Sequence, residues 1–359
     1  MMDFLKRKNI IFSAKRYGID ALSAMAQGLF CSLLIGTIVK TLGQQFSIPF
    51  LVDVGGYCSA MSGPAMAVAI GYALQAPTLV LFSLATVGYA ANALGSTTLS
   101  GSAGAGGPLA VLLIAIVASE CGKAVSKETK VDILVTPLVT ILVGVSLSAW
   151  IAPAIGTAAS SIGAFVEWAT VLQPFWMGIF VSVTVGIALT LPISSAAICA
   201  ALGLSGLAGG AAVAGCCAQM VGFAVLSFRE NRWGGLVSQG LGTSMLQMGN
   251  IVKNPRIWIP PILASAVTGP VATCVFHFQM NDPSGGVASG MGTCGMVGPI
   301  GVYAGWVNDI SIGMKAAITG MDWLAMALIC IIMPAVLTWL IGIPCRRMGW
   351  IKEGDLKLN

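Results

Sequence analysis

The stretch ILVTPLVTILVGVSLSAWIA, residues 133–152, runs for 20 positions without a charged side chain. The hydrocarbon core of a bilayer is about 30 Å thick, and an α-helix crosses it with about 20 apolar residues. Stretches of the same kind recur along the chain from Ala21 to Ile343. The sequence therefore predicts an all-α, polytopic transmembrane protein.

The composition of the whole chain supports this prediction. Of its 359 residues, 57% are hydrophobic and 9% are charged, and the mean hydropathy is +0.90, whereas about 25% of a soluble domain is charged. The net charge of +5 is explained by short loops and does not indicate a nucleic-acid partner. We expect about eight to ten spans, over residues 21–40, 53–75, 78–94, 108–122, 133–152, 164–191, 195–227, 257–280, 300–319 and 322–344.

Three glycine-rich clusters interrupt the apolar stretches, at residues 95–108, 203–215 and 283–301. Non-helical backbone at membrane depth is tolerated only where protein or a wet cavity satisfies its polar groups. The clusters therefore predict re-entrant hairpins or broken helices around a polar path, and the last cluster is the strongest candidate. The alternative is that they are ordinary loops or close-packing helix faces.

The distribution of charge predicts the orientation and the domain limits. Residues 1–20 are rich in Lys and Arg, and the positive-inside rule places such a segment in the cytoplasm. The tail at residues 345–359 is also cation-rich, so we predict that it too lies in the cytoplasm. Between them we expect a single transmembrane domain at residues 21–344. This predicts a multi-pass protein with a cytoplasmic N-terminus and the lipid bilayer as its surroundings.

A faint internal similarity suggests a two-fold repeat. The segment GLFCSLLIG at residues 28–36 resembles GIFVSVTVG at residues 178–186. A repeat would divide the domain into halves near residues 21–155 and 165–320. Many secondary transporters consist of two such halves with the substrate between them. Apolar sequences also match by chance, and that alternative stays open.

Ionisable groups at membrane depth are costly, so each is a candidate for function. Glu167 lies near the start of an apolar span and is followed by Trp168. A carboxylate beside an aromatic ring suits a sugar, because the carboxylate accepts hydrogen bonds from hydroxyls and the ring covers the apolar sugar face. The alternative is an interfacial Glu within an aromatic belt.

A second group of candidates precedes the last glycine-rich cluster. His277 is the only histidine, and Asn281 and Asp282 follow it. A histidine here is able to donate to a substrate oxygen or to change charge near neutrality, although a structural role explains it equally well. Asn92 and Gln219 are further candidates for binding a solute, with helix–helix hydrogen bonding as the alternative.

Enzymatic and metal-dependent functions find no support in the sequence. It contains no nucleophile elbow, Walker A loop, H-E-x-x-H helix or dinucleotide fingerprint. The ten cysteines include no C-x-x-C pair, and the chain contains only one histidine. We therefore expect no metal site. We therefore predict a protein without a cofactor and without catalytic activity.

Three segments resemble a known family. TKVDILVTPLVT (129–140), GTCGMVGPIG (292–301) and GWIKEGDLKL (349–358) are similar to the EIIC-like membrane proteins of the sugar phosphotransferase system. The closest resemblance is to the stand-alone EIIC group that includes the perfringolysin regulator-like proteins.

This resemblance implies a homodimer in the bacterial inner membrane, with hairpins near a central substrate cavity. EIIC domains move a sugar inward while an EIIB partner phosphorylates it, and they place a Glu and a His near the sugar hydroxyls. Glu167 and His277 are the candidates for these roles. No EIIA or EIIB domain is evident in the chain, so separate EIIB and EIIA chains are the expected partners. The leading hypothesis is an alternating-access transporter of a small, sugar-like solute, and the alternative is an EIIC-derived sensor or regulator without transport.

Overall fold

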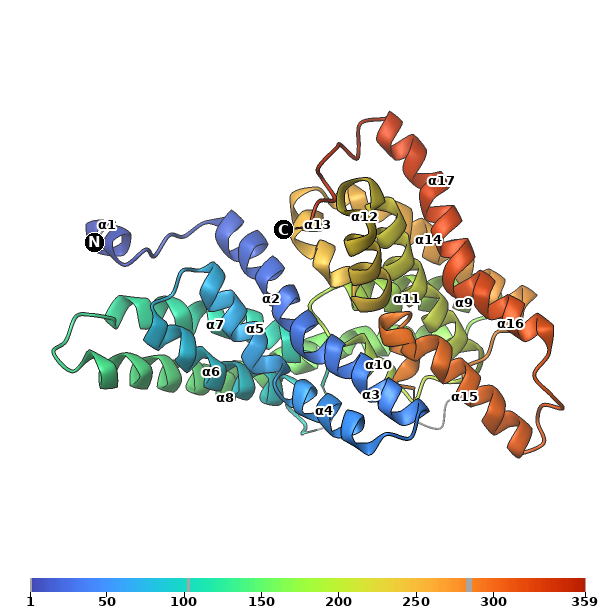
Figure 1. Cartoon of the computed structure of the whole chain (residues 1–359), viewed down its shortest axis with the longest axis horizontal. Helices are drawn as coiled ribbons and strands as arrows, with labels where there is room; N and C mark the ends of the chain where they lie inside the picture. The colour runs from blue at the N-terminus through green and yellow to red at the C-terminus, as the bar shows by residue number, and fades with distance from the viewer. Residues whose placement is uncertain (1, 102–103, 282–285, 359) are drawn as a thin grey trace. The chain divides into compact units, whose positions relative to one another are not determined.

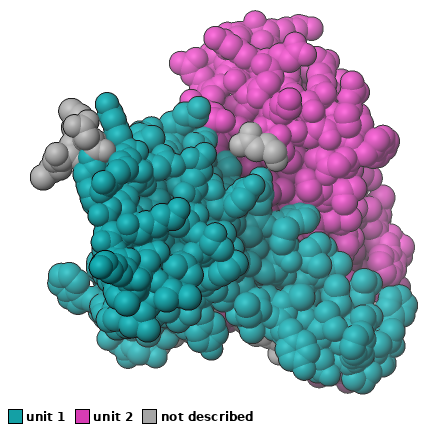
Figure 2. Space-filling model, turned by 60° about the vertical axis from the view of Figure 1, so that its left-hand side comes forward, with its two compact units in different colours: residues 1–160 teal, residues 161–359 magenta. Residues whose placement is uncertain are grey.

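The computed structural model describes residues 2–101, 104–281 and 286–358, and these residues fold almost entirely into helices (Figure 1). Helices make up 79% of the structure, and the described part contains no strand. The predicted all-α, polytopic fold is confirmed. The chain forms two compact units, residues 1–160 and residues 161–359, which Figure 2 shows in different colours.

Seven helical stretches among the described residues are long and apolar enough to cross a membrane. An eighth apolar helix, α9 (Pro174–Thr190), has 17 residues. The seven stretches are Arg16–Gln44, Thr78–Gly95, Gly107–Val125, Asp132–Thr170, Gly206–Leu226, Pro255–Val275 and Gly320–Arg347.

Unit 1 consists of helices that mostly pack against their neighbours in sequence, and α5 also packs against α2. Helix α5 packs against α6, α4 packs against α3, and α6 packs against α7. Between α5 and α6 the backbones approach closely, because a side chain at Gly63 would collide with the carbonyl group of Gly88. The helices are α1 (Met2–Arg7), α2 (Ala21–Leu29), α3 (Ile35–Gln45), α4 (Pro49–Ala60), α5 (Ser62–Ala73), α6 (Thr78–Gly95), α7 (Gly107–Val125) and the first part of α8 (Asp132–Thr170), with π-helical turns η1 (Arg16–Asp20) and η2 (Phe30–Leu34).

Helix α8 differs from the prediction. It is a single helix of 39 residues that continues through Pro137 and Pro153, so the expected break between residues 152 and 164 is absent. Proline is tolerated in membrane helices because neighbouring groups satisfy the freed backbone carbonyl. The chain breaks instead between Thr170 and Pro174, where α9 begins.

Unit 2 is built around helix α11 (Gly206–Leu226), which packs against α9, α14 and α17. A side chain at Gly215 would collide with the backbone of Ser182 on α9, so this part of the second glycine-rich cluster is a close-packing helix face. The remaining helices are α10 (Ser195–Ala201), α12 (Phe228–Val237), α13 (Met248–Lys253), α14 (Ile259–Pro270), α15 (Val297–Ser311), α16 (Gly320–Ala327) and α17 (Met333–Arg347). Short π and 3-10 turns link them: η3 (Ser238–Gly242), η4 (Ser244–Gln247), η5 (Pro255–Trp258), η6 (Val271–Val275), η7 (Ala288–Gly290), η8 (Cys294–Met296) and η9 (Leu328–Ile332).

The third glycine-rich cluster is a broken, buried segment beside α10 and α11. Its described part contains only the single turns η7 and η8 before α15 begins. Gly292 has φ +55°, and a Cβ there would lie 2.7 Å from Cys216 on α11. Gly290 accepts a hydrogen bond from the Ser195 hydroxyl at 2.7 Å. Glycine is needed here because the irregular backbone lies directly against a helix.

Candidate functional site

A non-helical segment at residues 276–281 presents polar side chains at a pocket in unit 2. Met280 exchanges two backbone hydrogen bonds of 3.0 Å with Gly206 at the start of α11, and Phe278 N–H donates to Ala272. Phe278 and Met280 are buried in the core, whereas His277 and Gln279 are exposed.

The pocket has a volume of about 300 Å³ and lies between this segment, α15 and α16. Pockets of this size accommodate small ligands. Its walls combine charged, polar and aromatic side chains: Phe276, His277, Phe278, Gln279, Trp306, Asp309, Met314, Lys315, Asp322 and Ala325.

Asp309 is the carboxylate of the pocket with unused hydrogen-bonding capacity. It is 8% exposed, and the Asn281 amide donates to its two oxygens at 2.9 and 3.2 Å. Asn281 is itself held in place, because its carbonyl oxygen accepts from the Gly206 N–H at 3.1 Å. An ionised carboxylate offers about four acceptor positions, so Asp309 is able to accept further hydrogen bonds from a bound solute.

Lys315 supplies a positive charge beside an aromatic wall. Its ammonium group lies 2.7 Å from Asp322 Oδ1 and 5.5 Å from the centre of the Trp306 ring. The other oxygen of Asp322 accepts from the backbone N–H and the hydroxyl of Thr319 in a capping box at the start of α16. Asp322 therefore positions Lys315 and caps α16, while the ammonium group keeps donors for a solute.

His277 occupies an unusual backbone conformation at the edge of the pocket. Its φ is 45°, which is uncommon for a residue other than glycine. Among the described residues its imidazole has no hydrogen-bond partner. A polar ring that is exposed at a pocket and not used by the fold is available to a ligand.

The other predicted residues lie apart from this pocket. Glu167 and Trp168 are exposed on α8 and do not line it. Trp168 belongs to an aromatic cluster, with ring centres 5.4 Å from Phe165 and 5.9 Å from Phe180. An exposed acid beside exposed aromatic rings has the composition of an interfacial belt as well as that of a sugar site.

The two predicted amides are engaged in helix–helix contacts. Gln219 is fully buried on α11, and its carbonyl oxygen accepts from the Trp258 indole at 2.8 Å. Its amide nitrogen contacts the Ser265 hydroxyl at 3.4 Å. Asn92 belongs to unit 1, where its amide lies 3.4 Å from the Ser62 hydroxyl. Asp282 lies outside the described residues.

Sequence reasoning did not assign Lys315, Asp322 or Trp306 to a site. A signal was present, because Asp309, Lys315 and Asp322 are the only Asp, Glu, Lys or Arg residues between positions 300 and 344. Scarce charges in an apolar stretch mark functional positions by default. For metals, the described residues contain no group of three or more His, Cys, Asp or Glu side chains that could hold an ion.

Comparison with protein families identifies the chain. A family profile described as "Phosphotransferase system, EIIC" matches residues 19–358. The chain belongs to the phosphotransferase system EIIC family. Comparisons with curated proteins and with solved structures give no match.

As an EIIC protein, the chain is a multi-pass membrane protein and a transporter component of the phosphotransferase system rather than a catalytic subunit. The match includes the whole of the pocket around Asp309. It also extends to residue 358 and so covers most of the C-terminal tail.

The tail of this EIIC protein is held by buried amides. Gln247 donates to the backbone carbonyl of Leu356 at 2.9 Å, and Asn250 donates to that of Lys357 at 2.9 Å. Asn231 bonds Leu356 and Leu358 through both ends of its amide, at 2.8 Å each. The side chain of Leu356 is fully buried. These contacts fix the tail against α12 and α13.

The amides of this tail-binding network are also bonded to one another. Gln247 donates to the Gln239 carbonyl at 2.9 Å and accepts from Asn250 at 2.8 Å. Gln239 donates to the Ser227 hydroxyl at 2.7 Å. Asn254 donates to Asp355 at 2.8 Å. Buried amides with completed hydrogen bonds stabilise the fold, and this network has a structural role.

Proposed function

We propose that this EIIC protein moves a small polyhydroxylated solute, a sugar or sugar derivative, by alternating access, and that it binds the solute in the Asp309 pocket. The observation that carries the proposal is the buried carboxylate of Asp309 facing a pocket with acceptor capacity left over. Sugar hydroxyls need both acceptors and donors. The Asp309 carboxylate supplies acceptors, and the Lys315 ammonium group supplies donors. The rings of Phe276 and Trp306 offer apolar surface for the sugar faces.

His277 and Asn281 complete the proposed site. His277 is a donor or acceptor at the pocket edge, and Asn281 orients the Asp309 carboxylate. Glu167 and Trp168 form a second candidate site, because an acid beside an aromatic ring has the same chemistry on a more exposed surface. Asn92, Gln219 and Asp282 are kept as candidates for the solute path.

The cellular setting is part of the proposal. The basic N-terminal segment and C-terminal tail support a cytoplasmic location for both ends in a bacterial inner membrane. Separate EIIA and EIIB chains would supply phosphoryl transfer to the solute, and a homodimer is the expected assembly.

A binding screen is the first test. Full-length protein in detergent is heated with a panel of sugars, sugar derivatives, nucleosides and carboxylates, and a ligand is recognised by the rise in its melting temperature. The proposal expects stabilisation by a polyhydroxylated solute. Asp309→Asn removes the charge and keeps the shape, and it should weaken binding at least about tenfold. Glu353→Gln, an exposed carboxylate in the tail, is the matched control.

Uptake into proteoliposomes separates the competing functions. A transporter accumulates the solute when EIIA and EIIB partners are present, and Asp309→Asn abolishes uptake. A sensor built on the EIIC scaffold binds the same solute without any flux. If Glu167→Gln abolishes binding while Asp309→Asn does not, the site lies at the aromatic cluster on α8 and α9 and not at the Asp309 pocket.

A further inference from the structure

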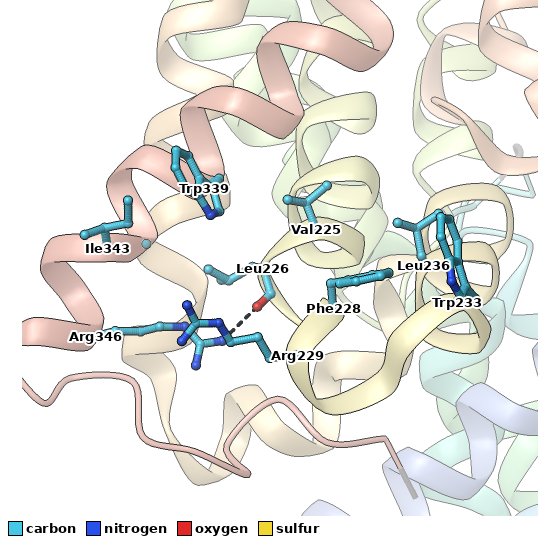
Figure 3. A pocket seen from close by; sticks show the side chains of 10 residues that line it. Val225, Leu226, Phe228, Arg229, Trp233, Leu236, Trp339, Ile343 and Arg346 are labelled. Atoms are coloured by element: carbon cyan, nitrogen blue, oxygen red, sulfur yellow. Dashed lines mark hydrogen bonds between the residues drawn. The ribbon is translucent and has the colours of Figure 1, made fainter.

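A second pocket in unit 2, unrelated to the Asp309 pocket, lies where α11, α12 and α17 meet (Figure 3). Its volume is about 380 Å³. Its walls are apolar, with Val225 and Leu226 from α11, Leu236 from α12, and Trp339 and Ile343 from α17. At one end the side chains of Arg229 and Arg346 extend into the same region of the pocket.

The two arginines have different roles. Arg346 donates to the carbonyl of Leu226 at 2.8 Å and pairs with the buried carboxylate of Glu230 at 3.3 Å. These bonds attach the end of α17 to the end of α11 and to the first turn of α12. Arg229 is exposed, and within the described part of the chain no carboxylate lies at ion-pair distance from it. The pocket therefore carries one positive charge that the protein does not neutralise.

The surface that leads to the pocket suits hydrocarbon. Val336, Trp339 and Leu340 on α17, with Ile332 at the end of η9, lie at helical spacing and are each 46–53% exposed. Trp233 at the pocket edge is 71% exposed and packs edge-to-face on Phe228. Exposed tryptophans are typical of the level at which lipid headgroups meet the hydrocarbon core. The apolar stripe of α17 thus leads to the pocket that contains the unpaired Arg229.

We propose that this pocket binds the phosphate of an anionic phospholipid, with an acyl chain lying along the apolar stripe of α17. The charge of Arg229 matches a phosphodiester, which an arginine binds through two parallel hydrogen bonds. Arg229 and Arg346 line the pocket together, and basic pockets between membrane helices recognise anionic headgroups. The apolar walls distinguish a lipid from free phosphate, because inorganic phosphate gains nothing from burying them.

The test is native mass spectrometry of the full-length protein with added lipid. Phosphatidylglycerol is compared with phosphatidylcholine of the same acyl chains, and with inorganic phosphate as a soluble anion. Wild type should retain phosphatidylglycerol about fivefold more than phosphatidylcholine, and Arg229→Gln should reduce this preference to about one. Arg232→Gln, an exposed arginine three positions further along the chain that does not line the pocket, should leave the preference unchanged.

Several results would overturn the proposal. Equal retention of the two lipids by wild type would show that charge is not recognised. An equal loss in Arg229→Gln and Arg232→Gln would show general surface attraction rather than a site. Displacement of the lipid by millimolar phosphate would identify a soluble-anion site. A change in the fraction of dimer, without a change in bound lipid, would show that a second copy of the chain covers this pocket.

Discussion

The tail-binding network and the Asp309 pocket are both polar regions of unit 2, but their hydrogen bonds are completed differently. In the network, neutral amides such as Gln247 and Asn250 bond one another and the backbone of the tail. In the pocket, Asp309 accepts from a single side chain, Asn281, and faces open volume. The first region uses its polar groups for the fold, and the second leaves them available.

The comparison separates a structural polar group from a ligand-binding one. Burial alone does not separate them, since both groups are buried: Gln247 is fully buried and Asp309 is only 8% exposed. What separates the two kinds of group is the number of hydrogen bonds made, compared with the number the group is able to make. A buried polar group with too few partners is costly unless a ligand or water supplies the missing hydrogen bonds. Substitutions in the two regions should therefore change different quantities, stability in one and solute binding in the other.

The largest effect on stability is expected for Gln247→Leu. This change removes three buried hydrogen bonds, to Gln239, Asn250 and Leu356. Each unsatisfied buried group costs about 1–3 kcal/mol, so the loss should amount to several kcal/mol and release the tail. Thermal unfolding in detergent and hydrogen exchange of residues 349–358 measure it. Gln279→Leu, on the exposed segment at the pocket, is the matched control and should melt like wild type. Similar melting of both variants would contradict the structural role of the network.

A smaller effect is expected for Gln219→Leu, which tests whether this amide serves the bundle or the solute. Its carbonyl oxygen accepts from the Trp258 indole at 2.8 Å, and its other contacts are 3.4 Å long. Losing the one short bond should cost about 1–3 kcal/mol of stability. If Gln219 belongs to the helix contacts, the affinity for the solute found in the binding screen is unchanged. A loss of affinity without a loss of stability would instead place Gln219 on the solute path.

Sequence reasoning predicted the helical membrane fold well because the bilayer requires long apolar helices and few charges. It also selected His277 and Asn281, since polar groups beside a glycine-rich break in an apolar chain stand out. It misplaced the break in α8, which continues through Pro153 as far as Thr170 because membrane helices tolerate proline. The tail-binding network could not be predicted from the sequence, because Gln247 and Leu356 are 109 positions apart and only the fold brings them together.

For the pocket, Lys315→Met should change binding more than stability. The ion pair with Asp322 is partly exposed, and such pairs contribute about 1 kcal/mol or less. The lost donor to a bound solute should lower affinity about tenfold. Lys352→Met, an exposed lysine in the tail, is the control and should leave both quantities unchanged. Unfolding of the Lys315→Met protein would show that the charge serves the fold, and it would remove the distinction between pocket and network.

The smallest effect concerns the N-terminus, where an ion-pair cluster takes part in the attachment, whereas buried amides hold the C-terminus. Glu128 lies 2.7 Å from Arg7 and 2.5 Å from Lys8. The hydrogen bond from the Lys8 ammonium, together with the charge of Arg7, lowers the pKa of Glu128 below its ordinary value of 4.5. Because the folded pKa is lowered, this attachment is complete above the ordinary pKa and is lost as the pH falls through the folded value.

Hydrogen exchange of residues 2–9 between neutral and acidic pH measures this attachment. Protection should fall with pH in wild type, whereas Glu128→Gln should show low protection at every pH. Salt at about 1 M should mimic acid, because the Debye length then falls to about 3 Å. Residues 356–358 of the tail should keep their protection under both treatments, since their bonds to Gln247 and Asn250 involve no net charge. If acid releases both ends together, the two termini are not held by different forces, and the contrast between charged and amide attachment does not hold.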